Sequence, residues 1–209
     1  RYARNGRTRS YAASLVLCLL SFLSKTTAMT LPFILILCDY LAGRKLSSKT
    51  AAEKIPFLGL AAVFTVITTM IHHPEGGITL KAEIPFSLTR SIFVAFHAIV
   101  FYFAKTFVPI NLSCLYPYPR GIETRIPLEY LVSPAIVLVP LGLFLIFFRK
   151  NKIVMFGLLF FVVTIFPFLQ IVPTTWTIAA DRYMYIPSVG IFLLIALLFA
   201  WIAGRGKAC

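Results

Sequence analysis

The sequence has few negative charges: Asp and Glu together number 7 among 209 residues, against 20 Lys and Arg. Charged residues of both signs make up 13% of the chain, about half of the share in an ordinary soluble domain. A soluble fold of this length needs polar residues to cover its surface, and this chain has too few. The composition therefore excludes an ordinary soluble globular protein.

Other absences narrow the function classes. The four cysteines, at positions 18, 38, 114 and 209, form no CxxC pair and no metal-ligand spacing, so we expect no metal site. No internal repeat is visible, and this ranks a transporter below other membrane functions, because many transporters contain inverted repeats. The sequence gives no indication of a cofactor. It does not begin with Met, and its basic start, Arg1 to Arg9, has no signal-peptide pattern.

Apolar residues dominate what is present. They make up 59% of the chain, including 20 Phe, and the mean hydropathy is +0.89. Seven apolar segments stand out, at approximately residues 10–24, 26–43, 55–71, 90–108, 130–148, 153–172 and 188–203. As helices, most would be roughly 24–30 Å long, close to the thickness of the hydrocarbon layer. This predicts a multi-pass membrane protein whose main partner is the lipid bilayer.

The net charge of +13 could indicate nucleic acid, but the positions of the basic residues argue otherwise. They form short clusters that flank apolar segments, as topology signals do. The four main clusters are Arg1, Arg4, Arg7 and Arg9; Arg44, Lys45, Lys49 and Lys54; Arg149, Lys150 and Lys152; and Arg205 and Lys207. The positive-inside rule places all four in the cytoplasm, and we expect no nucleic-acid partner.

If all four clusters are cytoplasmic, the three apolar segments between the second and third clusters give one crossing too many, and the simplest solution is that residues 90–108 do not cross the membrane. Arg90, His97 and Lys105 fall within about 80° on a helical wheel, a polar stripe that suits an interfacial helix. We therefore predict an all-α integral membrane protein with about six transmembrane helices and one interfacial or re-entrant helix. Residues 1–209 would form a single transmembrane domain.

Three stretches then lie outside the cytoplasm: residues 72–89, 109–129 and 173–187. The last contains Asp181 and Arg182, whose side chains would diverge on an extended backbone. Tyr183 and Tyr185 would share one face there and serve either as interface anchors or as a platform for a lipid carrier. Arg182 is the strongest candidate for a phosphate or sugar contact.

Two charged residues lie inside or beside the first apolar segments. Lys25 separates two of them, where a tight helical hairpin or a broken helix would fit. It would either contact an anion at the outer surface or snorkel to the headgroups. Asp39 lies near the inner end of its segment, and we expect it to be a structural anchor paired with a base such as Arg44.

Several motifs together resemble a family of bacterial multi-pass proteins that carry tetratricopeptide repeats. Eukaryotic relatives of that family are the transmembrane and tetratricopeptide-repeat O-mannosyltransferases, and both resemble GT-C glycosyltransferases. The motifs are Ser24 to Phe33, Leu37 to Tyr40, Glu53 to Phe57, Lys105 to Pro109, Tyr116-Pro117 and Ala180 to Pro187. Their order and spacing over roughly residues 1–200 carry the resemblance.

The resemblance implies a sugar donor linked to polyprenyl or dolichyl phosphate, with transfer to a hydroxyl of a protein or another acceptor at the outer face. It also implies a general base in a first outer loop upstream of residue 1, so the catalytic residues are unknown and this chain would lack the base. Repeats would follow the last helix. The chain would thus be a fragment of the membrane domain.

On the donor side, the resemblance assigns Lys25, Lys105 and Arg182 to the phosphate. Tyr116, Tyr183 and Tyr185 would line the carrier or sugar site, and Asp181 would orient Arg182. A non-catalytic membrane module that binds a lipid-phosphate carrier, or that scaffolds partners, is the alternative. The resemblance favours a bacterial cytoplasmic membrane over the endoplasmic reticulum membrane.

Overall fold

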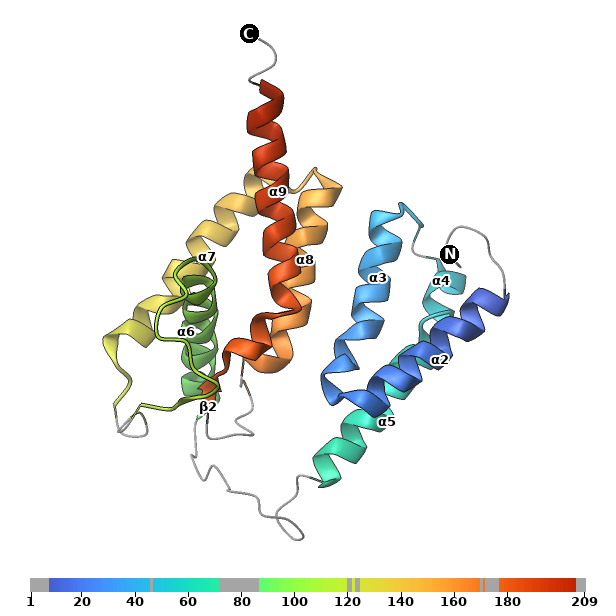
Figure 1. The fold of residues 1–209 in the computed structure, drawn as a ribbon, viewed down its shortest axis with the longest axis horizontal. Coiled ribbons are helices and arrows are strands. Elements are labelled where there is room, and N and C mark those ends of the chain that lie inside the picture. Colours follow the sequence, from blue (N-terminus) through green and yellow to red (C-terminus); the bar gives the residue numbers. More distant parts are fainter. Residues whose placement is uncertain are drawn as a thin grey trace. The chain divides into compact units, whose positions relative to one another are not determined.

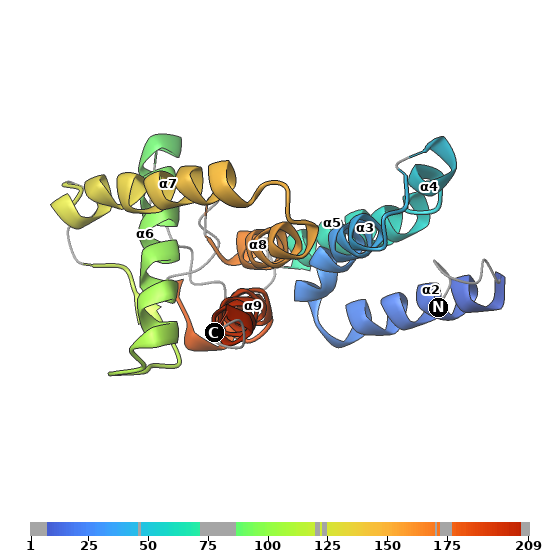
Figure 2. The ribbon, with the colours of Figure 1, turned by 90° about the horizontal axis from the view of Figure 1, so that it is seen from above.

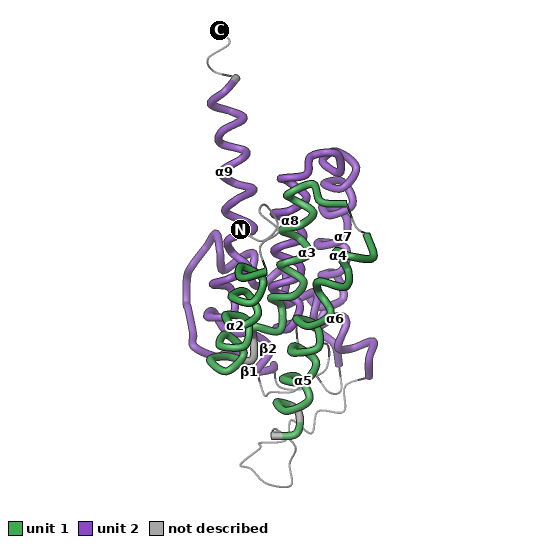
Figure 3. Tube along the Cα trace, turned by 90° about the vertical axis from the view of Figure 1, so that its right-hand side faces the viewer, with its two compact units in different colours: residues 1–79 green, residues 80–209 purple. Residues whose placement is uncertain are grey.

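The structure is a computed structural model that describes residues 8–45, 47–71, 87–119, 122, 125–169, 171 and 177–205. Its contacts divide the chain into two compact units, residues 1–79 (unit 1) and 80–209 (unit 2), coloured separately in Figure 3. Apart from one two-stranded sheet, the regular structure of the described residues is helical. The chain is therefore mostly helical, as the sequence predicts.

All seven apolar segments form helices. Among the described residues, four helices are long and apolar enough to cross a membrane: Ser48–Thr68, Leu88–Phe107, Leu128–Phe148 and Pro187–Gly204. Three further apolar helices are shorter, at Thr8–Ser24, Ala28–Leu41 and Lys152–Phe168. Backbone polar groups need partners where water is absent, and helices provide them within a single segment.

The described part of unit 1 begins with two helices joined by a turn (Figure 1). Helix α2 (Thr8–Ser24) ends before Lys25, whose backbone is extended, and the 3-10 turn η1 (Thr26–Thr30) leads into α3 (Leu31–Leu41). Pro32 lies in the first turn of α3, where a missing N–H costs nothing. The interruption predicted at Lys25, as a tight helical hairpin or a broken helix, is therefore confirmed.

A short helix α4 (Ser48–Ala52) and a long helix α5 (Ile55–Ile71) complete unit 1. Ser47 caps α4: its hydroxyl accepts from the Thr50 N–H, and the Thr50 side chain accepts from the Ser47 N–H. Cys18 and Phe22 of α2 pack with Phe57 and Ala61 of α5 to form the core of this unit.

Unit 2 contains four apolar helices: α6 (Leu88–Phe107), α7 (Leu128–Phe148), α8 (Lys152–Ile165) and α9 (Pro187–Arg205). Helix α8 ends at Ile165 and a 3-10 turn η2 (Phe166–Phe168) follows, earlier than the predicted end at residue 172. Pro167 lies in this 3-10 turn and has no N–H to continue the α-helical hydrogen bonds, which accounts for the change from α to 3-10 geometry.

Helices α8 and α9 pack closely through two glycines. A Cβ atom on Gly190 would lie 2.5 Å from the Gly157 carbonyl oxygen and 2.9 Å from the Phe161 backbone nitrogen. A Cβ on Gly157 would lie 2.9 Å from a methyl group of Leu194. Small residues at a helix interface allow two backbones to approach in this way.

Helix α6 crosses the other helices of unit 2 steeply. Figure 2 looks along α9, and α6 lies across that view, at a large angle to α7. At the α6–α7 crossing the His97 ring stacks on Tyr130 with centroids 3.9 Å apart, and His97 Nδ1 lies 3.3 Å from the Ser133 hydroxyl. His97 of the predicted polar stripe therefore packs against α7.

Two short strands join distant parts of unit 2. Strand β1 (Tyr116–Pro117) pairs antiparallel with β2 (Thr177–Ala179), and a 3-10 turn η3 (Asp181–Met184) follows β2. Tyr102 of α6 is buried, and its hydroxyl accepts a 3.3 Å hydrogen bond from the Ala180 N–H. The segment that carries Asp181 and Arg182 is thus fixed to both α6 and the loop after it.

Candidate functional site

The candidate site in unit 2 is formed by the loop of residues 108–119 and by η3. Asp181 connects the two: its Oδ2 accepts a 2.7 Å hydrogen bond from the Ser113 N–H and lies 3.1 Å from the Tyr116 hydroxyl. Its other oxygen, Oδ1, is buried without a hydrogen-bond partner among the described residues. Asp181 therefore anchors the loop to the segment before α9.

Tyr116 is the second connection. Its hydroxyl lies 3.1 Å from the Asn111 carbonyl oxygen and accepts a 2.8 Å hydrogen bond from the Ser113 N–H. Burial, together with the hydrogen bond to Asp181, raises the pKa of Tyr116. The phenol therefore stays protonated at neutral pH and remains a donor to the carboxylate.

Lys105, at the end of α6, closes the same loop. Its ammonium donates to the carbonyl oxygens of Ile110 and Asn111 and lies 5.6 Å from the ring centroids of Phe101 and Tyr116. Asn111 has a φ of 53°, in the left-handed region that Asn tolerates, so both Lys105 and Tyr116 can reach its carbonyl group. Most of the N–H donors of Lys105 are thus used to hold the backbone of the loop in place.

Arg182 differs from Lys105 because it faces solvent. Its Nη1 lies 3.3 Å from Cys114 Sγ, and its guanidinium lies 5.3 Å from the ring centroid of Tyr183. The side-chain hydrogen bond with Tyr183 raises the pKa of Arg182, and a guanidinium is cationic at neutral pH in any case. In the part of the chain that the structure describes, Arg182 forms no ion pair.

Aromatic stacking positions Arg182. The Tyr183 ring stacks on Phe168 of η2, with centroids 4.4 Å apart and planes 15° from parallel. The guanidinium therefore rests on a ring that the core of unit 2 holds in place. A planar cation supported in this way can donate two parallel hydrogen bonds to a phosphate.

The structure groups most, but not all, of the predicted site residues. Lys105, Tyr116 and Asp181 contact one another directly or through the loop, and Arg182 and Tyr183 follow on η3. Asp181, Arg182 and Tyr183 lie in the 3-10 turn η3, and Tyr185 at its end is also helical, so the extended backbone assumed in predicting diverging charges and a shared tyrosine face does not occur. Asp181 bonds to Ser113 and Tyr116, so the described contacts give it no direct role in orienting Arg182. Tyr185 is 77% exposed, and Lys25 belongs to unit 1.

Sequence reasoning did not identify three participants: the Ser113 N–H, Cys114 and Phe168. A backbone N–H has no sequence signature, and Phe168 is one of 20 Phe. Cys114 could have been identified as a candidate from the sequence, because it is a cysteine outside the apolar segments in a predicted outer loop.

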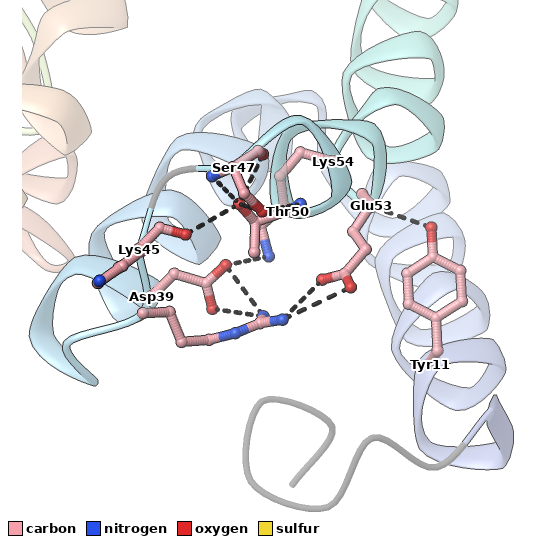
Figure 4. A network of polar contacts seen from close by, with 8 residues as sticks. Tyr11, Asp39, Lys45, Ser47, Thr50, Glu53 and Lys54 are labelled. Atoms are coloured by element: carbon pink, nitrogen blue, oxygen red, sulfur yellow. Dashed lines mark hydrogen bonds and ion pairs between the residues drawn. The ribbon is translucent and has the colours of Figure 1, made fainter.

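Unit 1 contains a second polar cluster, which Figure 4 shows at close range. Asp39 is 7% exposed and pairs with two cations, Arg44 at 3.2 Å and Lys54 at 2.7 Å. Arg44 also pairs with Glu53 at 3.1 Å. These carboxylates raise the pKa of Arg44 against the opposing effect of its desolvation. The predicted pairing of Asp39 with Arg44 is thus confirmed.

The end of α3 explains why Arg44 meets Asp39. Gly43 has a φ of 69°, which favours glycine, and lets the chain fold back on the helix. The Arg44 N–H then donates to the Asp39 carbonyl oxygen at 3.0 Å and the Gly43 N–H to that of Tyr40 at 3.1 Å. This fold-back places the Arg44 side chain beside the Asp39 carboxylate.

No group of three or more His, Cys, Asp or Glu residues that could hold a metal ion occurs among the described residues. Comparison with protein-family models, with curated proteins and with solved structures finds no match to this chain. The function must therefore be argued from the geometry and from the motifs of the sequence.

Proposed function

We propose that this chain is part of a membrane glycosyltransferase, which uses a sugar linked to polyprenyl or dolichyl phosphate to glycosylate a protein or another hydroxyl acceptor. The observation that carries the proposal is Arg182, an exposed guanidinium supported by Tyr183 and paired with no carboxylate in the described part of the chain. A lipid-linked sugar presents a phosphate at the membrane surface, which is what such a cation binds.

A membrane location is supported by the surface of the helices. Only 6% of the apolar window of α7 is buried against the rest of the chain, and its Leu128, Val139 and Phe147 are 61–75% exposed. A continuous apolar surface of this kind needs lipid or another apolar partner around it. A bacterial cytoplasmic membrane is proposed, with the endoplasmic reticulum membrane as the alternative.

The proposed topology has about six crossings, with α6 as the interfacial or re-entrant helix. The steep angle between α6 and α9 supports this, because a helix across the axis of a spanning helix lies closer to the membrane plane (Figure 2). The basic turn at Arg149 and Lys150 precedes α8 and η3 follows it (Figure 1). Arg182 would then lie outside, opposite the cytoplasmic cluster.

In the proposed reaction, the bond between the anomeric carbon of the sugar and the phosphate oxygen breaks. The acceptor oxygen forms the new bond to that carbon, its proton goes to a general base, and the lipid phosphate leaves with the electron pair. Arg182 would stabilise the charge that develops on the leaving phosphate. The base is expected outside this chain, since Asp181 is engaged by Ser113 and Tyr116.

Replacing Arg182 with Ala should weaken the binding of polyprenyl phosphate to the protein in nanodiscs by about tenfold or more, because a charge-assisted contact is lost. Binding is measured by titration followed by native mass spectrometry, and transfer by incorporation of labelled sugar into a hydroxyl peptide. Arg182→Lys should recover part of the binding, whereas Lys150→Ala is the control for loss of charge. Unchanged binding and transfer in Arg182→Ala would remove Arg182 from the mechanism.

A non-catalytic module that binds the lipid carrier is the second candidate. It is favoured by the engagement of Asp181, which leaves no carboxylate available next to Arg182 in the described residues. The same titration separates the two functions. The carrier-binding module would be supported if the intact protein binds the lipid carrier through Arg182 but transfers no sugar from a lipid-linked donor.

The proposed sidedness can be tested with native Cys114, which is exposed and adjacent to Arg182. In sealed cells or vesicles, a membrane-impermeant maleimide added outside should label Cys114 and should not label a cysteine introduced by Lys150→Cys. The labelling is read by mass shift in a background in which the other cysteines are replaced by Ser. Labelling of both positions from the same side would overturn the topology and the location of the donor site.

A further inference from the structure

The segment at the end of α6 in unit 2 exposes apolar side chains. Four of the six residues from Phe107 to Leu112 are large and apolar, and their side chains are 55–61% exposed: Phe107, Val108, Ile110 and Leu112. These four residues are named the apolar loop. Exposed apolar side chains that are neighbours in the chain in this way mark a surface that contacts lipid or an apolar partner.

The backbone of the apolar loop receives hydrogen bonds from within unit 2. The Val108 N–H donates to a carbonyl oxygen in the last turn of α6 at 2.7 Å, and the Ile110 N–H donates to that of Val108 at 2.8 Å. Pro109 has no N–H, and the carbonyl oxygens of Ile110 and Asn111 accept from the Lys105 ammonium. These polar groups are therefore paired, whereas the apolar side chains face outward. Irregular backbone needs such pairing before it can enter an apolar medium.

A cation lies close to the far end of the apolar loop. Cys114, two residues after Leu112, contacts Arg182, which is exposed. Two residues span at most about 7 Å, so Leu112 lies within about that distance of the backbone that holds Arg182 in contact. Cations attract the anionic headgroups of lipids. Apolar side chains next to a cation are the pattern of a segment in the membrane interface.

We propose that the apolar loop inserts into the membrane at the boundary between headgroups and acyl chains, on the side where Arg182 lies. The contacts of Lys105 with the loop carbonyl groups permit the insertion. Acyl chains of the lipids cover the four apolar side chains, whereas Arg182 and Cys114 stay at the level of the headgroups. The insertion is about 5–10 Å deep, the usual depth of apolar side chains in the interface.

The bilayer is favoured over another occupant because the hydrocarbon around α6 already reaches Phe107, the last residue of that helix. Helix α6 is long and apolar enough to cross a membrane, and its Phe103, one turn before Phe107, is also exposed. The apolar loop therefore continues the exposed apolar surface of the helix. The insertion requires neither a bound sugar donor nor transfer, so its failure and that of the proposed function can be distinguished.

The depth of the loop is measured with a nitroxide spin label on Leu112→Cys in phosphatidylcholine nanodiscs, with the native cysteines replaced by Ser. Oxygen concentrates in hydrocarbon and a soluble nickel chelate concentrates in water, so the relaxation of the label by each reports its surroundings. The Leu112 label should be relaxed more by oxygen than by the chelate. The order should be reversed for Lys150→Cys, the control in the exposed turn between α7 and α8.

Two variants of the Leu112→Cys protein test the part played by Lys105. Lys105→Met removes the donor from the Ile110 carbonyl oxygen, so the loop should move toward water and the chelate should relax the label several-fold faster. Lys105→Arg keeps N–H donors at this position and should preserve the depth. An unchanged depth in Lys105→Met would overturn the proposal that pairing by Lys105 permits the insertion.

Other results would overturn the insertion itself. A Leu112 label as accessible to the chelate as the Lys150 label would place the loop in water. A label protected from both oxygen and the chelate would indicate that a protein surface, such as a second copy of this chain, covers the loop. The nanodiscs contain no polyprenyl phosphate, so hydrocarbon detected at Leu112 would come from the bilayer and not from a carrier chain.

Discussion

Replacing Asp39 with Asn is expected to lower the free energy of unfolding of unit 1 by about 3 kcal/mol, the lower end of the range for breaking a buried ion pair. The substitution keeps the shape and removes the charge that Arg44 and Lys54 share. Arg44 retains Glu53, but Lys54, whose side chain is only 12% exposed, loses the one ion-pair partner that it has among the described residues. The loss is measured by thermal unfolding of the purified protein in detergent.

A second substitution tests whether lost charge pairing or lost packing causes the destabilisation by Asp39→Asn. Adding Lys54→Met to Asp39→Asn removes the uncompensated ammonium and keeps a long apolar side chain, so most of the lost stability should return. Lys49→Ala, on the exposed face of α4, is the control and should change stability by less than about 0.5 kcal/mol. A double variant no more stable than Asp39→Asn alone would show that Lys54 is not the source of the penalty.

Replacing Gly190 with Ala is expected to force α8 and α9 apart. The added methyl group would lie 2.5 Å from the Gly157 carbonyl oxygen, and backbone cannot move away as a side chain can. Overpacking of this kind costs about 1–3 kcal/mol and sometimes more. The expected result is a melting temperature lower by several degrees, with a matching loss of lipid-carrier binding because η3 precedes α9 directly.

Two other glycines provide a graded control for Gly190. Gly157→Ala meets a flexible methyl group of Leu194 at 2.9 Å and should cost less than Gly190→Ala. Gly142→Ala in α7 meets nothing within 4 Å, and since Ala is the better helix former by about 0.5–1 kcal/mol it should be neutral or stabilising. Equal effects of the three substitutions would mean that the close approach of α8 and α9 contributes nothing to stability.

The positions of the helices were predictable because apolar runs bounded by charge specify them. The prediction at Lys25 succeeded for the same reason, since a charge between two apolar runs interrupts a helix. The end of α8 was missed by seven residues, 165 against 172, although Pro167 was visible. Hydropathy did not mark this end, and a proline alone does not mark a helix end either, because α7 continues through Pro134 and Pro140.

The site was only partly predictable, because its contacts connect residues far apart in the chain. The motif around Asp181 and Arg182 identified the segment, but the 3-10 turn that contains both residues was not predicted. The hydrogen bond from the Ser113 N–H to Asp181 spans 68 positions and depends on the pairing of β1 with β2. Two strands of two and three residues have no periodicity that a sequence could reveal.

The pairing of β1 with β2 also determines when the site can form during synthesis. Tyr116 and Asp181 are separated by 65 positions, and α7 and α8 must be made and inserted before the second strand leaves the ribosome. Until then the Ser113 N–H and the Tyr116 hydroxyl cannot donate to the Asp181 carboxylate. Contacts of long sequence separation form slowly, so a chain stalled before β2 would already contain most of its helices and still lack the proposed donor site.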